Sequence, residues 1–426
     1  MRKTRRLQAV LCGVLCAALL SGCGGMFSLD DMLRAPQLTG EYSAVQTALN
    51  DHLNESAQLK YPNSGEFLSP FLFGDWDGDG VQDAAVLFVS SGSANAQLAV
   101  LQTDEDGSWQ VRDVAEGLSD SVDTVRFAAL QQNGADQILV GYTTPGDKYL
   151  AAYAYKDGRL EAVLQQPYTQ YIVEDLTGSG TDNLVLLASD AEGQTQVQML
   201  VEGPEGFSLM QVIGLSAEQF SGYASLAAGV GQYGGNYLIL DGYTGAAGNY
   251  LASSVLQYNM TTGQMNAASL PGTKDIYESS LRYAACLTSR DLDGDGIVEI
   301  PTQGEEAGTL NLTQNKRYSF VRWMDFTRTR SEKSFGIVDE EYGFYLALPE
   351  EWEGNIQMVD DGDGGVALYN MAGDVQYLRL RLTAELGPAE GWARVGSVSS
   401  RQLQVQLAEG AGSVSVYQLA RGFYLL

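Results

Sequence analysis

One acidic, glycine-containing motif returns along the chain and constrains its fold more than any other feature. Its strongest copies are FGDWDGDGVQDAAVLFV, near residue 80, and DLDGDGIVEIPTQ, near residue 296. A weaker copy, EDLTGSGTDNLVLLA, lies near residue 180, and two fainter copies keep only the frame of the motif. The aligned glycines are Gly80, Gly134, Gly180, Gly234 and Gly296, with spacings of 54, 46, 54 and 62 residues. A repeat of this length is typical of chains that use one supersecondary unit several times.

Each repeat contains four short segments with the composition of β-strands, rich in β-branched and aromatic residues. In the second repeat they are residues 124–130, 136–142, 148–155 and 159–166; in the third they are 171–175, 182–188, 195–201 and 207–214. Four strands in about 40–50 residues is the period of a β-propeller blade, and stacking blades buries faces that a lone sheet leaves in water. We therefore predict an all-β fold, a five-bladed β-propeller with four strands per blade, over residues 65–340. A β-solenoid or an array of β-sandwiches is the alternative.

The segments on either side of the repeats have different patterns. Apolar residues at helical spacing (Val45, Leu49 and Leu53) predict one amphipathic helix before the propeller. Residues 341–426 are expected to form a small antiparallel β domain, with strands at 366–371, 376–382, 401–408 and 414–420. Its opening, Tyr342-Gly343-Phe344 with Leu348-Pro349 and Trp352, resembles PsbP-like modules that follow repeats in lipoproteins of Firmicutes.

Two copies of the motif have the spacing of a calcium loop. Ca²⁺ takes six to eight oxygen ligands at about 2.3–2.6 Å, and a glycine at the sixth position allows the sharp turn that such a loop needs. Carboxylates at positions 1, 3, 5 and 9 and a carbonyl at position 7 supply these oxygens. The predicted ligands are Asp75, Asp77, Asp79, the carbonyl of Val81 and Asp83 in the first repeat, and Asp291, Asp293, Asp295, the carbonyl of Ile297 and Glu299 in the fifth.

These loops are not EF-hands, because position 12 is Val86 or Thr302 and a strand-like segment follows. They resemble instead the calcium loops of FG-GAP or VCBS propeller repeats, as in the integrin α head, where the loop joins the first two strands of a blade. The resemblance implies structural calcium at the rim of a ring. Acidic surface turns without metal are the alternative. If the ring closes in order, the first and fifth blades are neighbours and both sites flank the seam.

The other three copies have lost some or all of the predicted ligands. The third keeps Asp175 but has Thr177, Ser179 and Asn183 where acids belong, so weak or no calcium binding is expected there. The second and fourth copies have Ala129 and Gly229 at position 1.

The N-terminus has the features of an export signal. Four cationic side chains in MRKTRR precede an apolar run from Ala9 to Leu20, which is shorter than the about 20 residues that span a bilayer. The following LSGC resembles the lipobox of bacterial lipoproteins, which implies cleavage before Cys23 and lipidation of its thiol. We therefore predict a signal peptide over residues 1–22, a tether and helix over 23–64, and a lipid anchor on the extracytoplasmic face of the cell membrane. Ordinary secretion is the alternative.

Composition limits the functions that remain. The 53 acidic residues against 25 Lys and Arg argue against nucleic acid as a partner. A Ser/His/Asp site is not expected, because His52 is the single histidine of the chain, and Cys286 is expected to be a buried structural thiol. We predict a non-catalytic surface lipoprotein that binds an extracellular protein or glycan. A glycoside hydrolase-like propeller enzyme is the alternative, although Asp123 and Asp241 cannot be singled out as its carboxylate pair.

Overall fold

The computed structural model describes residues 40–131, 134–203, 206–231, 234–268, 276–283, 285–303, 317–327, 331–362, 364–384, 387 and 389–426. The predicted signal peptide and Cys23 lie outside these residues. The described chain is all-β apart from short helices, and its strands form six antiparallel sheets, three with four strands and three with five. None of its helices is both long and apolar enough to cross a membrane.

One helix, α3 (Gly40–Leu53), precedes the strands, as the spacing of Val45 and Leu49 predicts.

The first sheet contains β1 (Gln58–Leu59), β2 (Phe71–Gly74), β3 (Asp83–Val89), β4 (Gln97–Thr103) and β5 (Trp109–Glu116). The second contains β6 (Ser121–Ala128), β7 (Gln137–Thr143), β8 (Lys148–Lys156) and β9 (Arg159–Tyr168). The third contains β10 (Gln170–Glu174), β11 (Asn183–Ser189), β12 (Thr195–Gly203) and β13 (Gly206–Gly214). The fourth contains β14 (Gly222–Val230), β15 (Asn236–Thr244), β16 (Tyr250–Asn259) and β17 (Gln264–Ala267). In each of the second to fourth sheets, strands adjacent in sequence are adjacent in the sheet.

The fifth sheet joins the last repeat to the C-terminal part of the chain. After the short helix α4 (Ile276–Ser279), it contains β18 (Ile300–Thr302), β19 (Tyr318–Asp325), β20 (Ser331–Asp339), β21 (Phe344–Leu348) and β27 (Phe423–Leu425). A last sheet contains β22 (Ile356–Asp360), β23 (Val366–Asn370), β24 (Gln376–Thr383), β25 (Ala393–Val398) and β26 (Arg401–Leu407). A single core lies between these two sheets, so the C-terminal part covers one face of the fifth sheet.

Residues 414–420 were expected to form a strand, but this prediction is wrong. Residues Val416–Arg421 form helix α5, which begins at a capping box in which Ser415 and Gln418 bond each other's backbone N–H groups. Leu419 is buried on its inner side. The cap and one buried leucine outweigh the alternating pattern of this short segment.

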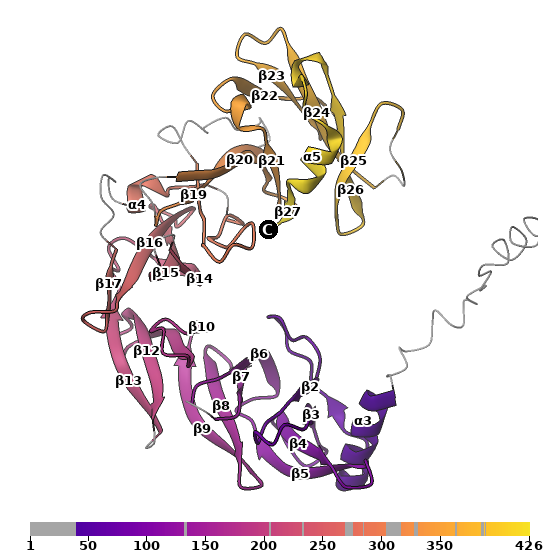
Figure 1. Cartoon of the computed structure of the whole chain (residues 1–426), viewed down its shortest axis with the longest axis vertical. Helices are drawn as coiled ribbons and strands as arrows, with labels where there is room; N and C mark the ends of the chain where they lie inside the picture. The colour runs from indigo at the N-terminus through magenta and orange to yellow at the C-terminus, as the bar shows by residue number, and fades with distance from the viewer. Residues whose placement is uncertain are drawn as a thin grey trace, which may run out of the picture.

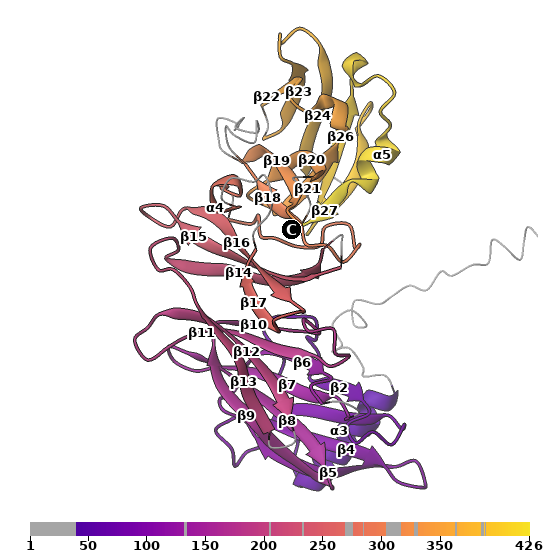
Figure 2. The same cartoon turned by 60° about the vertical axis from the view of Figure 1, so that its left-hand side comes forward.

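The sheets follow one another along an arc (Figures 1 and 2). Side chains of the first and second sheets share one core, the second and third share another, and the third and fourth share a third. Successive side chains of β3 point to opposite faces of the sheet: Ala85 and Leu87 face the second sheet, whereas Val86 and Phe88 face helix α3.

The arc does not close into a ring. No core cluster of the described residues combines the first and fifth sheets, which lie far apart in both views. Val45 and Leu49 of α3 cover the face of the first sheet that would meet the last blade in a closed ring, and the C-terminal sheet covers the corresponding face of the fifth. The prediction that the two acidic loops flank a closed seam is therefore wrong.

A buried ion pair lies where the fourth sheet meets the start of the fifth repeat. Asp241, on β15, and Arg282 are both fully buried, and Asp241 Oδ1 lies 2.6 Å from Arg282 Nη2. Asp241 also accepts hydrogen bonds from the hydroxyls of Ser225, Ser253 and Ser289, at 2.5 to 2.7 Å. Burial opposes ionisation of Asp241, but the Arg282 charge and these hydrogen bonds together lower its pKa.

Acid is expected to weaken this junction. Because the pKa of Asp241 is lower in the folded chain, its contribution to stability is complete above the unfolded value of about 3.9 and is lost as the pH falls through the folded value. At pH 7, Asp241→Asn should cost about 3–5 kcal/mol, since it leaves Arg282 buried without a counter-charge. Guanidinium unfolding between pH 2.5 and 7 measures both effects. Asp147→Asn, at an exposed turn, is the control, and equal acid sensitivity of the wild type and Asp241→Asn would contradict this assignment.

Candidate functional site

The acidic loop of the first repeat joins β2 to β3, the position expected from its sequence. Asp75 holds the turn: its Oδ1 accepts from the backbone N–H of Gly78, at 2.7 Å, and its Oδ2 from that of Gly80, at 2.9 Å. Gly80 has a φ of 84°, which a residue with a Cβ adopts only with strain. At the end of the loop, Asp83 Oδ2 accepts from the backbone N–H of Trp76, at 2.9 Å.

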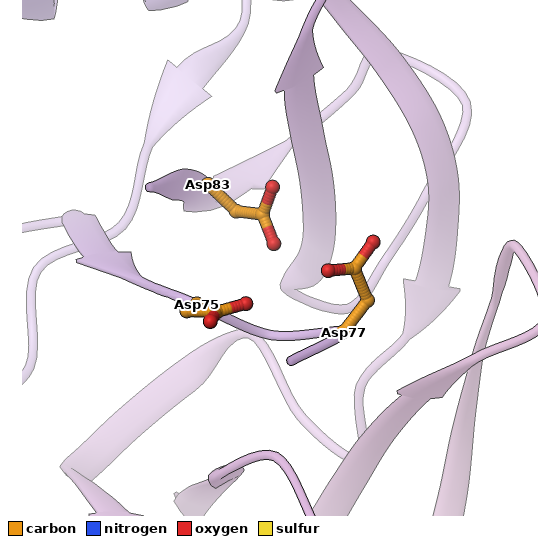
Figure 3. A group of neighbouring side chains, drawn as sticks. All are labelled: Asp75, Asp77 and Asp83. Carbon is orange, nitrogen blue, oxygen red and sulfur yellow. The ribbon is translucent and has the colours of Figure 1, made fainter. Parts of the chain in front are cut away.

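Three of the predicted calcium ligands of this loop lie together. Carboxylate oxygens of Asp75, Asp77 and Asp83 are within 4.8 Å of one another, and Figure 3 shows the three carboxylates facing a common space. Asp79 does not belong to this group; its Oδ1 accepts from the N–H of Val81, at 2.7 Å. Burial raises the pKa of Asp83, and the charges of Asp77 and Asp79 raise it further. Three oxygens at this spacing fit one cation of the size of Ca²⁺.

The loop of the fifth repeat has the same backbone geometry. Asp291 Oδ1 accepts from the N–H of Gly294, at 2.7 Å, and its Oδ2 from that of Gly296, at 2.8 Å. Asp291, Asp293 and Asp295 bring carboxylate oxygens within 4.8 Å of one another. Glu299 is outside this group and fully buried, and its Oε2 accepts from the N–H of Leu292, at 2.9 Å.

The degenerate repeats use the same position for packing or for a turn with fewer carboxylates. In the third, Asp175 accepts from the N–H groups of Ser179 and Gly180, although two hydroxyls and an amide replace the other acids. In the second, Ala129 donates its N–H to Asp182 of the third repeat, at 2.8 Å. In the fourth, a Cβ on Gly229 would lie 2.8 Å from the side chain of Val298, so glycine allows the fifth repeat to approach.

Beside the first acidic loop lies a cleft with a volume of about 810 Å³. Its walls come from the first three sheets: Trp76 and Asp77 from the first, Gln137 and Tyr155 from the second, and Glu202 from the third. Five acidic side chains line it (Asp77, Asp136, Asp157, Glu161 and Glu202), against the two cations Lys156 and Arg159. The sequence alone does not predict this cleft, because its residues come from three repeats and share no motif.

Hydrogen bonds fix the polar groups of the cleft. Glu202 accepts from the side-chain amide of Gln131, at 2.6 Å, and from that of Gln137. Gln137 and Trp76 are each only 2% exposed, and among the described residues neither Gln137 Oε1 nor Trp76 Nε1 has a hydrogen-bond partner. One acceptor and one donor in the lining therefore remain unsatisfied, a state that costs about 1–3 kcal/mol for each group unless water or a ligand supplies the partner.

The acidic loop and the cleft are connected. Asp77 lines the cleft, and its Oδ2 accepts from the amide of Gln102, at 2.7 Å; Gln102 Oε1 in turn accepts from the Tyr155 hydroxyl, at 3.4 Å. Trp76 follows Asp75 directly, and its ring packs 4.9 Å from that of Phe127 in the second sheet. The conformation of the loop thus determines one wall of the cleft.

Asp123 and Asp241 are not a catalytic pair. Asp123 accepts from the Tyr168 hydroxyl, at 2.6 Å, and forms an ion pair with Lys148, at 2.9 Å. Asp241 lies two sheets away from Asp123 and is paired with Arg282. Each carboxylate has its own structural partners.

Neither of the remaining candidate reactive groups supports nucleophilic catalysis. Burial raises the pKa of Cys286 to about 11, so its thiol is protonated at neutral pH. His52 is exposed in the last turn of α3 and contributes to neither the cleft nor the acidic loops.

No family model and no curated protein matches this chain. Solved structures share parts of its arrangement. A candidate 6-phosphogluconolactonase from Bacteroides uniformis is 13% identical, with a TM-score of 0.31, over 74% of this chain and 85% of that one. Another, from Bacteroides fragilis, is 11% identical, with a TM-score of 0.30, over 75% and 92% of the two chains. The rhamnogalacturonan lyase YesW is 11% identical, with a TM-score of 0.30, over 82% and 90%.

These comparisons correct two predictions. The similar structures are described as enzymes, so the predictions of a non-catalytic binding protein and of a chain that is not an enzyme are wrong by this comparison. The alternative, an enzyme that acts on carbohydrate, agrees better with those descriptions.

Proposed function

We propose that this chain acts on a carbohydrate in the cleft between the first three sheets. The observation that carries this proposal is the lining of the cleft: two aromatic side chains and a carboxylate oriented by two amides. Sites for small molecules combine apolar or aromatic walls with a few fixed polar groups.

Charge selects among carbohydrates. Five acids against two cations make the cleft negative, which favours neutral or basic sugars over polyuronates. Glu202 is the carboxylate we assign to the chemistry, because two amides hold it in place while its remaining lone pairs can accept a proton. It would take this proton from a water that attacks the anomeric carbon, while the departing glycosidic oxygen gains a proton from solvent.

A glycan panel tests this assignment. The purified chain should release reducing ends from at least one neutral or basic glycan and none from polyuronates. Glu202→Gln should reduce the rate by about 100-fold or more, because it removes the proton acceptor. Glu192→Gln, at an exposed turn of the third sheet, is the matched control and should retain full activity. Activity confined to polyuronates would contradict the proposed preference for neutral or basic sugars. Release of no reducing ends from any glycan would contradict the proposed enzymatic activity.

We also propose that the five repeats are propeller-type repeats of the FG-GAP or VCBS kind, arranged in an open arc, and that the first loop binds structural calcium. Asp75, Asp77 and Asp83 are the carboxylates that would hold it. The ion would relieve repulsion among these carboxylates and stabilise the turn that carries Trp76 and Asp77 into the cleft wall.

Calcium removal tests the loop. The melting temperature should fall by about 5 °C or more in EDTA relative to millimolar calcium, because the ion binds only the folded chain. The double variant Asp75→Asn, Asp77→Asn should lose this calcium dependence, and Asp147→Asn should keep it. Identical melting with calcium and with EDTA would contradict the assignment.

Finally, we propose that Cys23 anchors the chain by lipid to the outer face of the cell membrane. In a bacterial host the wild type should incorporate labelled palmitate and sediment with membranes. Cys23→Ser should do neither, whereas Cys286→Ser, which changes the half-buried thiol, should do both. Membrane association of an unlabelled Cys23→Ser chain would contradict a lipid anchor.

A further inference from the structure

The acidic loop of the fifth repeat differs from that of the first because a lysine side chain enters its carboxylate cluster. Lys333 lies on β20, and its Nζ is 2.9 Å from Glu299 Oε1 and 3.6 Å from Asp293 Oδ2. It also forms an ion pair with Asp295. The Lys333 side chain is only 16% exposed. One ammonium therefore contacts three of the four carboxylates of this loop.

The first loop has no equivalent cation. Asp77 accepts instead from a neutral amide, that of Gln102. None of the ion pairs found among the described residues involves Asp75, Asp77, Asp79 or Asp83. The two loops share these backbone hydrogen bonds, and they differ in their counter-ion and in which carboxylates lie together.

We infer that Lys333 is the built-in counter-ion of the fifth loop, and that calcium binds there only by displacing its ammonium. The ammonium lies against oxygens of three carboxylates that Ca²⁺ would need as ligands, and it repels a second cation at the same place. The chain itself thus supplies part of the positive charge that this loop requires. The first loop depends on a cation from solution. This contrast rests on the calcium site proposed above for the first loop.

The consequence is a chain with one calcium-responsive end. Lys333 ties the loop to β20 in the sheet that the C-terminal part covers, so this end keeps its loop without metal. The first loop forms a wall of the cleft, so calcium acts on the end of the molecule that holds the proposed site.

Calcium titration of paired variants tests the inference. In a chain carrying Asp75→Asn and Asp77→Asn, the fifth loop is the remaining fully acidic one. Adding Lys333→Met, which keeps the apolar stem and removes the charge, should tighten calcium binding by about ten-fold or more. Lys60→Met in the same background is the control, because Lys60 pairs with Asp120, at 3.8 Å, and touches neither loop.

Equal calcium affinity with and without Lys333→Met, in chains that retain the wild-type circular dichroism spectrum, would overturn the inference. If the methionine variant does not fold, Lys333→Gln supplies a neutral donor at the same place and should shift the affinity in the same direction. A separate outcome bears on the first loop alone: calcium binding of the wild type that is unchanged by Asp75→Asn and Asp77→Asn contradicts its proposed site. The comparison at Lys333 remains valid in that case.

Discussion

Each of the five repeat sheets has apolar side chains on both faces, and the need to cover these ten faces determines the arrangement of everything else. Neighbouring sheets cover most of them, through separate cores between successive pairs. Two outer faces remain, one at each end of the arc. Helix α3 covers the first and the C-terminal sheet covers the last, so neither end needs the other. Stacked-repeat proteins solve the same problem with terminal caps, whereas a closed propeller buries its end faces against each other.

The capped arc also explains where a site can form. In each of the first three repeats, the turns after the first and the third strand lie at the same end of the sheet. These turns from three successive sheets together line one cleft. The polar residues of that cleft are fixed through bonds between sheets, such as Gln137 to Glu202 and Tyr155 to Gln102. The acidic loop enters the same network through Asp77. A structural cation and a polar cleft are therefore parts of one region.

The sequence predicted the local structure better than the contacts between repeats. Strand positions in the second and third repeats agree with the structure to within a few residues, because alternation and turn pairs are local signals. The arc was missed because Val45 and Leu49 give only a helical pattern, which does not say which sheet face the helix covers. The roles of Glu202 and Lys333 were also missed. Lys333 contacts a loop 34 residues earlier in sequence, at Glu299, and Gln137 contacts Glu202 across 65 residues, so no short motif contains either pair.

The order of the sheets has a consequence for how the molecule comes apart. A sheet in the middle of the arc has two neighbouring repeat sheets, and a sheet at either end has one. In a closed ring every sheet would have two, because the end sheets would contact each other. With nearest-neighbour contacts alone, breaking one junction divides the chain into two parts that each keep their own cores. The junction at Asp241 and Arg282 is held by a charge pair as well as by apolar packing, so pH and denaturant need not open the arc at the same place. Unfolding should therefore proceed in steps set by individual junctions, and the step seen first depends on the solvent.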